Sequence, residues 1–176
     1  MRGYFAIGAE GLSKPLNAGN LFRSAHAFGA SFIFTVGGSY KTARSGGDTS
    51  HAPTRVPLYE YESAADLALP GSCRLVGIEL LDDAVELPSF KHPPQAAYIL
   101  GPERGNLSPE IVAQCDNVVK IPTAFCINVA MAGAIVMYDR TIAMGRFPAR
   151  AVSSIATPEE LPPHIHGKQK FRTKKI

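Results

Sequence analysis

Three stretches of the sequence combine polar side chains with glycine or proline in patterns that suit ligand binding. The first is "NAGNLFRSAHAFG", residues 17–29, whose apolar spacing predicts a helix. Amide and guanidinium groups hold hydroxyls and phosphates well, because they present donors and acceptors in fixed planes. The alternatives are a solvated helix face and, for Asn17, a helix N-cap. On a helical wheel the two kinds of side chain fall on opposite arcs: Leu21, Phe22, Ala25 and Phe28 on one, and Asn17, Asn20, Arg23 and Ser24 on the other.

The second stretch is "LGPERG", residues 100–105, at the end of an apolar run. A helix is predicted to begin at Ser108, with Pro109 at its first position. Ligands of open α/β sheets bind beyond the carboxyl ends of the strands, where glycine lets the backbone come close. The stretch lacks the lysine of a phosphate-binding P-loop. The alternative is a turn with a structural role alone.

The third stretch is "KIPTAFCINVAMAGAIVMYDR", residues 120–140, which predicts a strand, a proline turn and a helix. Residues 121–138 carry no charge, a composition that also occurs in membrane spans. Pro122 and several polar residues interrupt the run, and its apolar part after Asn128 covers only about half a bilayer. We therefore expect a buried helix from Val129 to about Gly145 and no membrane segment. For Asn128 the alternative to a site residue is a helix cap.

The elements that must position these stretches follow from the alternation of short apolar runs with helical patterns. This alternation predicts an α/β fold with a mostly parallel sheet and helices on both faces. Strands are predicted at residues 3–10, 31–38, 54–61, 73–81, 96–105 and 116–122, and helices at 17–29, 63–68, 108–114 and 129–145. Pro57 counts against the third strand. Residues 1–150 are expected to form the domain, and residues 151–176 a flexible, proline-containing and basic extension.

The composition favours a cytoplasmic protein. The chain has 176 residues, 45% of them hydrophobic and 19% charged, which suits one folded domain. Its three cysteines form no CxxC pair, which argues against a disulfide framework and a structural zinc site. The N-terminal stretch breaks at Glu10 and Gly11 before a signal-peptide core could form.

Basic residues gather in two places that suit contact with a polyanion such as RNA. A long polar loop over residues 40–55 contains Lys41, Arg44 and Arg55. The segment from His164 onward carries five basic residues and no acid: Lys168, Lys170, Arg172, Lys174 and Lys175. The alternative for this tail is a solubilising segment without a partner.

In this order and at these separations, the three stretches resemble the SpoU/TrmH group of RNA ribose 2′-O-methyltransferases in the SPOUT superfamily. The motif N-x-G-N-x-x-R matches residues 17–23, and the second motif matches residues 100–105. The third motif runs from Ile121-Pro122 through Asn128 to Tyr138-Asp139, and the resemblance covers roughly residues 3–147. Two features depart from the pattern: the segment before Asn128 is shorter than usual, and Cys126 stands where serine is common.

The resemblance implies a C-terminal trefoil knot that binds a bent S-adenosylmethionine, and a homodimer whose interface contains the helix from Val129. It also implies that no metal is needed. The expected cofactor-binding residues are Ile78, Leu100, Gly101, Gly105, Ile121, Cys126 and Ile127. The expected catalytic residues are Arg23, which faces the cofactor of the other subunit and orients the ribose hydroxyl, together with Asn17, Glu103 and Asn128.

The expected RNA contacts are Asn20, Arg104 and the basic residues of the loop and the tail. The resemblance implies transfer RNA as the first choice of substrate and ribosomal RNA as the second. Two other functions stay open. One is a catalytically inactive RNA-binding protein of the same fold, and the other is a metabolic α/β enzyme that binds a nucleotide cofactor.

Overall fold

The computed structural model describes residues 3–38, 48, 50–145 and 147. Its contacts divide the chain into a unit of residues Met1–Gly145 and a unit of residues Arg146–Ile176. The expected RNA contacts Lys41, Arg44, Lys168, Lys170, Arg172, Lys174 and Lys175 lie outside the described residues.

A seven-stranded sheet forms the centre of the first unit, in the order β3-β2-β1-β6-β4-β7-β5, and all its pairings are parallel. The strands are β1 (Tyr4–Glu10), β2 (Phe32–Val36), β3 (Leu58–Tyr61), β4 (Arg74–Ile78), β5 (Val85–Glu86), β6 (Gln95–Leu100) and β7 (Asn117–Lys120). β1 and β6 are continuous apolar runs because they are buried on both faces in the middle of the sheet. The predicted parallel α/β sheet is confirmed.

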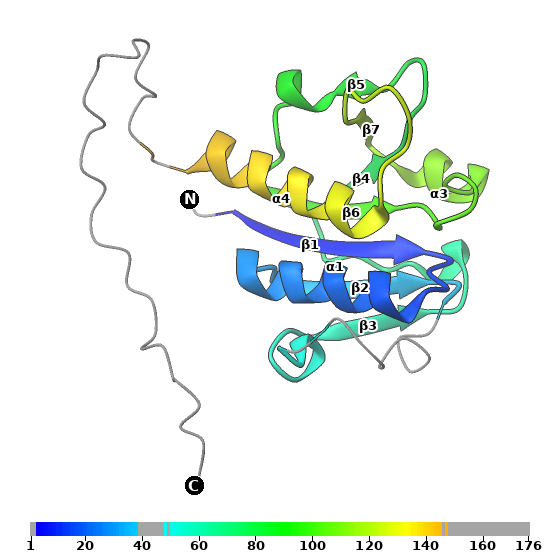
Figure 1. The fold of residues 1–176 in the computed structure, drawn as a ribbon, viewed down its shortest axis with the longest axis vertical. Helices are drawn as coiled ribbons and strands as arrows, with labels where there is room; N and C mark the ends of the chain where they lie inside the picture. The colour runs from blue at the N-terminus through cyan, green and yellow to red at the C-terminus, as the bar shows by residue number, and fades with distance from the viewer. Residues whose placement is uncertain (1–2, 39–47, 49, 146, 148–176) are drawn as a thin grey trace, which may run out of the picture. The chain divides into compact units, whose positions relative to one another are not determined.

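Two long helices, α1 (Pro15–Phe28) and α4 (Val129–Met144), lie side by side across one face of the sheet (Figure 1). They share a core with the β1 side chains Phe5, Ile7 and Ala9. The other face is covered by the short helix α3 (Pro109–Gln114), whose Ile111 packs against Ile99 of β6. Each face therefore has its own apolar core, as expected of a parallel sheet.

Gly133 allows α1 and α4 to approach closely. A Cβ atom at this position would overlap the Cδ1 atom of Leu21 in α1. Gly133 therefore serves a contact within the chain. Five large apolar side chains on α4 remain exposed: Met131, Ile135, Tyr138, Ile142 and Met144.

The structure corrects two local predictions. Residues 63–68 do not form an α-helix but a single 3-10 turn, η2 (Ala64–Asp66), because the segment is too short to sustain helical hydrogen bonds and returns to extended backbone at Leu67. The first helix begins at Pro15, two residues before the predicted start, so Asn17 is not its N-cap; Lys14 occupies that position.

Smaller features were not predicted: β5, the 3-10 turn η1 (Ala52–Thr54) and the 3-10 turn η3 (Leu87–Ser89). Pro57 lies just before β3, an edge strand that pairs with β2 alone. Proline has no amide hydrogen to donate, and at this position only the Pro57 carbonyl is needed. That carbonyl accepts a hydrogen bond from the Ile33 amide at 2.8 Å. In the part of the chain that the structure describes, no helix is long and apolar enough to cross a membrane.

Candidate active site

A pocket lies at the carboxyl ends of β4, β6 and β7. Its empty volume is about 550 Å³, a figure that includes the solvent at its open mouth. The lining residues are Ile78, Glu79, Leu80, Leu100, Gly101, Pro102, Gly105, Ile121, Thr123, Cys126, Ile127, Val129 and Ala132. The seven residues expected to bind a cofactor are all among them.

The walls of this pocket are mostly apolar. Ile78, Leu100 and Ile121 come from the ends of three neighbouring strands or directly after them, and Ile127 and Ala132 come from the start of α4 and the loop before it. Such walls suit a flat apolar group such as a purine ring. Glu79 is the one charged side chain among the lining residues.

The loop from Gly101 to Leu107 folds back over the end of β6. The Glu79 carboxylate holds it there by accepting a hydrogen bond from the Leu107 amide at 2.8 Å. A Cβ atom on Gly101 would lie 3.0 Å from the Leu107 nitrogen and 3.2 Å from Glu79 Oε2. Gly105 has a φ of +117°, which side chains rarely adopt. Glycine is therefore required at both positions.

Glu103 connects this loop to the start of α1. Its Oε1 accepts hydrogen bonds from the Lys14 amide at 3.0 Å and from Asn17 Nδ2 at 3.1 Å. Its Oε2 accepts from the Ser13 amide at 3.2 Å and from Ser13 Oγ at 3.1 Å. Partial burial by itself raises the pKa of this carboxyl. Hydrogen bonds from backbone amides and from Asn17 outweigh burial, so the pKa lies below its ordinary value.

Asn17 and Asn128 complete a chain of hydrogen bonds that joins all three sequence motifs. Asn128 Nδ2 donates to Asn17 Oδ1 at 2.9 Å, while its own Oδ1 accepts from the Ala130 amide at 2.9 Å. Asn128 therefore both caps α4 and bridges to α1. Asn17 is buried, with 7% of its surface exposed, and does not belong to the exposed polar face that the helical wheel predicts. We call Glu103, Asn17 and Asn128 the carboxyl-edge cluster.

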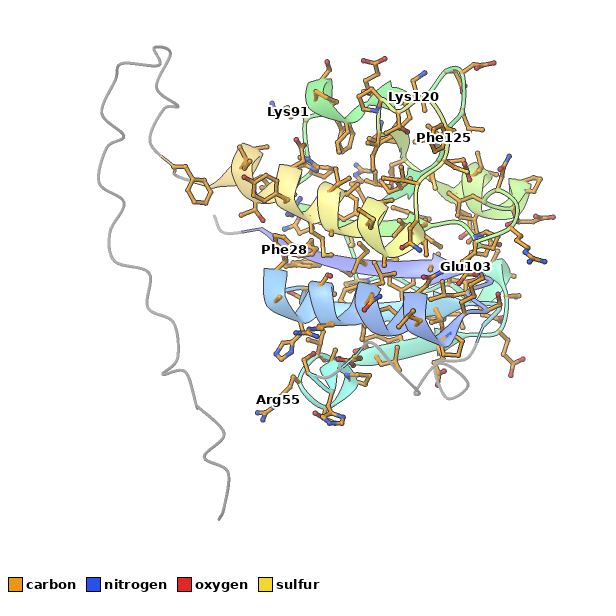
Figure 2. The ribbon with its side chains drawn as sticks, in the orientation of Figure 1. Phe28, Arg55, Lys91, Glu103, Lys120 and Phe125 are labelled. Atoms are coloured by element: carbon orange, nitrogen blue, oxygen red, sulfur yellow. The ribbon has the colours of Figure 1, made fainter. Side chains whose placement is uncertain are left out.

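None of the other expected site residues is among the lining residues. Glu103, Asn17 and Asn128 do not line the pocket themselves, although the sequence neighbours Pro102, Ile127 and Val129 do. Arg23 and Asn20 are exposed on α1, and neither is among the lining residues. Arg104 is exposed next to Glu103 in the loop after β6. Figure 2 shows Glu103 beside the starts of α1 and α4, whereas Arg55 lies toward the other end of α1. The structure therefore does not bring Arg55 to the pocket.

Glu79, Leu80 and Thr123 line the pocket but were not predicted as site residues. Glu79 and Leu80 directly follow β4. The rule that ligands bind beyond the carboxyl ends of strands would have selected them, as it selected Gly101 after β6.

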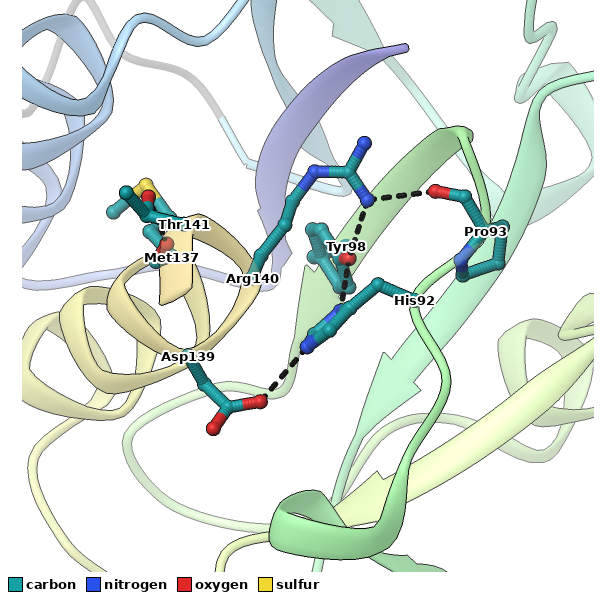
Figure 3. Close-up of polar contacts among 7 residues, drawn as sticks. All are labelled: His92, Pro93, Tyr98, Met137, Asp139, Arg140 and Thr141. Carbon is teal, nitrogen blue, oxygen red and sulfur yellow. Dashed lines mark hydrogen bonds and ion pairs between the residues drawn. The ribbon is translucent and has the colours of Figure 1, made fainter. Parts of the chain in front are cut away.

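A second polar cluster lies at the opposite edge of the sheet, under the C-terminal half of α4 (Figure 3). Arg140 donates hydrogen bonds to the carbonyls of Tyr4, Pro93 and Pro94 and, at 3.1 Å, to the hydroxyl of Tyr98. These partners precede or begin β1 and β6. We call Arg140, Tyr98, His92 and Asp139 the amino-edge cluster.

The hydrogen bonds of the amino-edge cluster indicate that the His92 side chain is neutral. Because Arg140 only donates, the Tyr98 oxygen accepts from it, and the Tyr98 proton points to His92 Nδ1 at 2.6 Å. His92 Nε2 then donates to Asp139 at 2.9 Å. Burial lowers the pKa of His92 despite the opposing effect of Asp139, and burial raises the pKa of Tyr98 to about 12. None of the four residues lines the pocket, and the hydrogen bonds of Arg140 tie α4 to the amino ends of β1 and β6.

Comparison with known proteins identifies a family that the sequence matches. Residues 4–138 match a family model described as the SpoU rRNA Methylase family. No curated protein matches the sequence. Within the described residues no group of three or more His, Cys, Asp or Glu side chains has an arrangement that could hold a metal ion.

Three solved structures illustrate the similarity of fold. The SpoU methyltransferase AviRb from Streptomyces viridochromogenes, in complex with AdoMet, has a TM-score of 0.70 at 22% identity, over 83% of this chain and 60% of its own. The A. aeolicus TrmH/SpoU tRNA modifying enzyme has a TM-score of 0.67 at 18% identity, over 81% and 76%. A protein studied for the 2-OH methylation of C/U34 on tRNA has a TM-score of 0.66 at 22% identity, over 83% and 100%. The chain thus spans about three fifths of AviRb and the full length of the last protein.

Proposed function

The chain belongs to the SpoU rRNA methylase family, whose methyltransferases use S-adenosylmethionine, and from this premise we propose that it methylates a ribose 2′-hydroxyl of RNA. One observation carries the proposal. The carboxyl-edge cluster joins the three sequence motifs beside a single pocket, and the residues expected to hold the cofactor all line that pocket.

The lining of the pocket suits S-adenosylmethionine in its chemistry. Ile78, Ile121 and Ile127 offer apolar surfaces for adenine, and the missing side chain of Gly101 leaves space that a Cβ atom would fill. Cys126 supplies a small side chain there, and no hydroxyl contact. We propose that these residues, with Leu100 and Gly105, hold the cofactor.

The work of the protein in this reaction is positioning. Bound S-adenosylmethionine supplies a methyl group that is already activated by the sulfonium, so neither a metal nor a covalent intermediate is required. Correct placement of two reactants is worth roughly 7–11 kcal/mol of barrier. Glu103 and Asn17 fix the loop after β6 to α1, and Asn128 fixes the start of α4, so the walls of the site are held in place.

Arg23 is proposed to act on the cofactor site of a second copy of the chain. It is exposed and does not line the pocket of its own chain, so a homodimer is needed to bring it to the reaction. An arginine is a poor general base, because its pKa lies above about 12. We expect Arg23 to bind the phosphate beside the target nucleotide and to orient the ribose hydroxyl.

The exposed apolar side chains of α4 support the homodimer. Met131, Ile135, Tyr138 and Ile142 recur at helical spacing along one side of α4, and Met131 is 62% exposed. A contiguous apolar surface of this kind is typical of a protein–protein interface. We propose that two copies of α4 meet there.

The RNA is proposed to be a transfer RNA, with ribosomal RNA as the second choice. The chain covers the full length of the tRNA 2-OH methylation protein but only three fifths of AviRb, which favours the first. Arg104, beside the cofactor loop, and Asn20, on α1, are the described residues best placed to contact it. Lys41, Arg44 and the basic tail are proposed to add phosphate contacts, as is Arg55 from further away.

The family resemblance also carries the proposals of a cytoplasmic location and a C-terminal trefoil knot. The loop after β6 and the loop after β7 both line the pocket, which is the part of the chain where the knot is expected. Knots are very rare among protein folds, so tracing this connection in an experimental map is a demanding check.

Transfer of tritium from labelled S-adenosylmethionine to bulk transfer RNA tests the function directly, followed by mass-spectrometric mapping of ribose methylation in RNA from cells with and without the gene. Arg23→Ala is expected to lower turnover by at least about a hundredfold with cofactor affinity nearly unchanged. Arg23→Lys keeps the charge but loses the planar fork. Cofactor binding without transfer to any RNA would instead identify an inactive RNA-binding protein.

A further inference from the structure

Glu79 places a carboxylate inside an otherwise uncharged pocket. It follows directly after Ile78, the last residue of β4, so it stands one residue beyond the apolar wall. Its Oε1 accepts a hydrogen bond from the Leu80 amide at 2.9 Å, and its Oε2 accepts from the Leu107 amide at 2.8 Å. These two bonds hold the carboxylate in one orientation.

Each of the two oxygens keeps the capacity to accept one more hydrogen bond, because a carboxylate oxygen can accept two. Glu79 lines the pocket together with Gly101, so its carboxylate borders the space that a ligand would occupy. An ionised carboxylate only accepts hydrogen bonds. The matching ligand group therefore offers two neighbouring O–H or N–H donors.

The ribose of the adenosyl group meets this description. It is bonded directly to adenine, so it lies next to whatever wall adenine occupies, and its 2′- and 3′-hydroxyls form a pair of adjacent donors. Acidic residues after a strand bind ribose hydroxyls in the same way in open α/β sheets that hold dinucleotides. On the basis of the proposed function, we propose that Glu79 binds the ribose diol of the cofactor and selects adenosyl ligands that carry both hydroxyls.

Two other roles for Glu79 make different predictions. If Glu79 only holds the loop in place through Leu107, loss of the Glu79 carboxylate lowers the affinity for every adenosyl ligand by the same factor. If it pairs with the ammonium of the methionine part, its loss affects only ligands that contain that part. Comparing nucleosides with and without hydroxyls separates the three roles.

The test is calorimetric titration with 5′-methylthioadenosine and with its 2′,3′-dideoxy analogue, neither of which carries an ammonium group. The wild-type protein is expected to bind the diol at least about tenfold more tightly, as suits hydrogen bonds to a charged group. In Glu79→Gln this ratio is expected to fall several-fold. Glu86→Gln in β5, which is exposed and does not line the pocket, is the matched control and is expected to keep the wild-type ratio.

If the wild-type protein binds the two nucleosides with nearly equal affinity, the inference is overturned without any variant. It is also overturned if Glu79→Gln loses affinity for both nucleosides equally. A variant that binds both nucleosides as the wild type does but loses affinity for S-adenosylhomocysteine assigns Glu79 to the ammonium instead, which also overturns it. Wild-type protein that binds neither nucleoside nor S-adenosylmethionine refutes the proposed function itself. Cofactor binding without ribose selection refutes only the role of Glu79.

Discussion

The two polar clusters at the ends of α4 tie the same helix to the sheet in different ways. Asn128, in the carboxyl-edge cluster, caps the start of α4, and Arg140, in the amino-edge cluster, lies about 18 Å further along the helix. Arg140 is 5% exposed and His92 is 6% exposed, whereas Asn128 is exposed and Glu103 is partly exposed. In the amino-edge cluster Arg140, His92 and Tyr98 are buried and only Asp139 is partly exposed. In the carboxyl-edge cluster only Asn17 is buried, and sequence neighbours of the cluster line the pocket.

This difference in burial indicates a difference in role. Arg140 and its partners satisfy one another inside the protein, so their hydrogen bonds contribute to stability and leave nothing for a ligand. The carboxyl-edge cluster holds loops that line the pocket, so its hydrogen bonds contribute to the shape of the site. Variants in the first cluster should therefore change the free energy of unfolding, and variants in the second should change turnover.

The largest effect is expected from Arg140→Met. The substitution leaves the carbonyls of Tyr4, Pro93 and Pro94 without their buried donor, and breaking a buried charged network costs about 3–5 kcal/mol. Urea denaturation measures the change. The control is Arg74→Met, which removes an exposed ion pair with Asp116 and should cost no more than about 1 kcal/mol. Equal losses in the two variants would contradict a structural role for the amino-edge cluster.

Glu103→Gln is expected to affect turnover more than stability. Four donors converge on the two oxygens of Glu103, and a glutamine side chain must turn its own NH₂ group toward some of them. The displaced loop should lower the rate of methyl transfer by about a hundredfold, the scale that a misplacement of about 1 Å reaches. Single-turnover kinetics and urea denaturation measure the two quantities. A variant with normal turnover and a loss of stability as large as that of Arg140→Met would reverse the proposed division of roles.

Asn128 allows its two functions to be separated. Asn128→Ala removes both the cap and the bridge to Asn17 and should cost about 1 kcal/mol of unfolding free energy. Asn128→Ser keeps an oxygen that caps α4, so it should restore most of that stability but not the bridge. Turnover is expected to be equally low in both variants. If serine restores activity together with stability, the bridge to Asn17 has no role in the site.

The smallest effects are expected in the pH dependence of stability. The pKa of His92 is lowered in the folded protein, so its contribution is complete above the ordinary value of 6.5 and is lost as the pH falls below it. The pKa of Glu103 is also lowered, and its contribution is lost only as the pH falls below 4.5. Urea denaturation between pH 4 and 8 should show a decline in unfolding free energy from His92 as the pH falls below 6.5.

Matched variants assign the two pH windows. His92→Gln should flatten the decline below pH 6.5 and leave the loss below pH 4.5, and Glu103→Gln should do the opposite. An unchanged profile in His92→Gln would mean that His92 is not held neutral by its surroundings.

The sequence by itself determined most of the sheet, both long helices and seven of the thirteen residues that line the pocket. Gly101 was found because it follows the end of an apolar strand, where ligands of open α/β sheets bind, and Ile121 was found through the family resemblance. Asn17, Glu103 and Asn128 were found through the motifs that contain them. These signals are local, so they can be read without knowing what the chain folds against.

Only the tertiary structure decided which polar groups meet and which of them are buried. Asn17 is 111 residues from Asn128, and Arg140 is 136 residues from Tyr4, so no local pattern predicts either contact. The same limit applies to residues 63–68, where helical spacing is present but the segment closes only one 3-10 turn, and to Glu79, whose orientation depends on the Leu107 amide. The burial of a polar side chain depends on partners supplied by other elements, and these are set by how the helices and loops pack on the sheet.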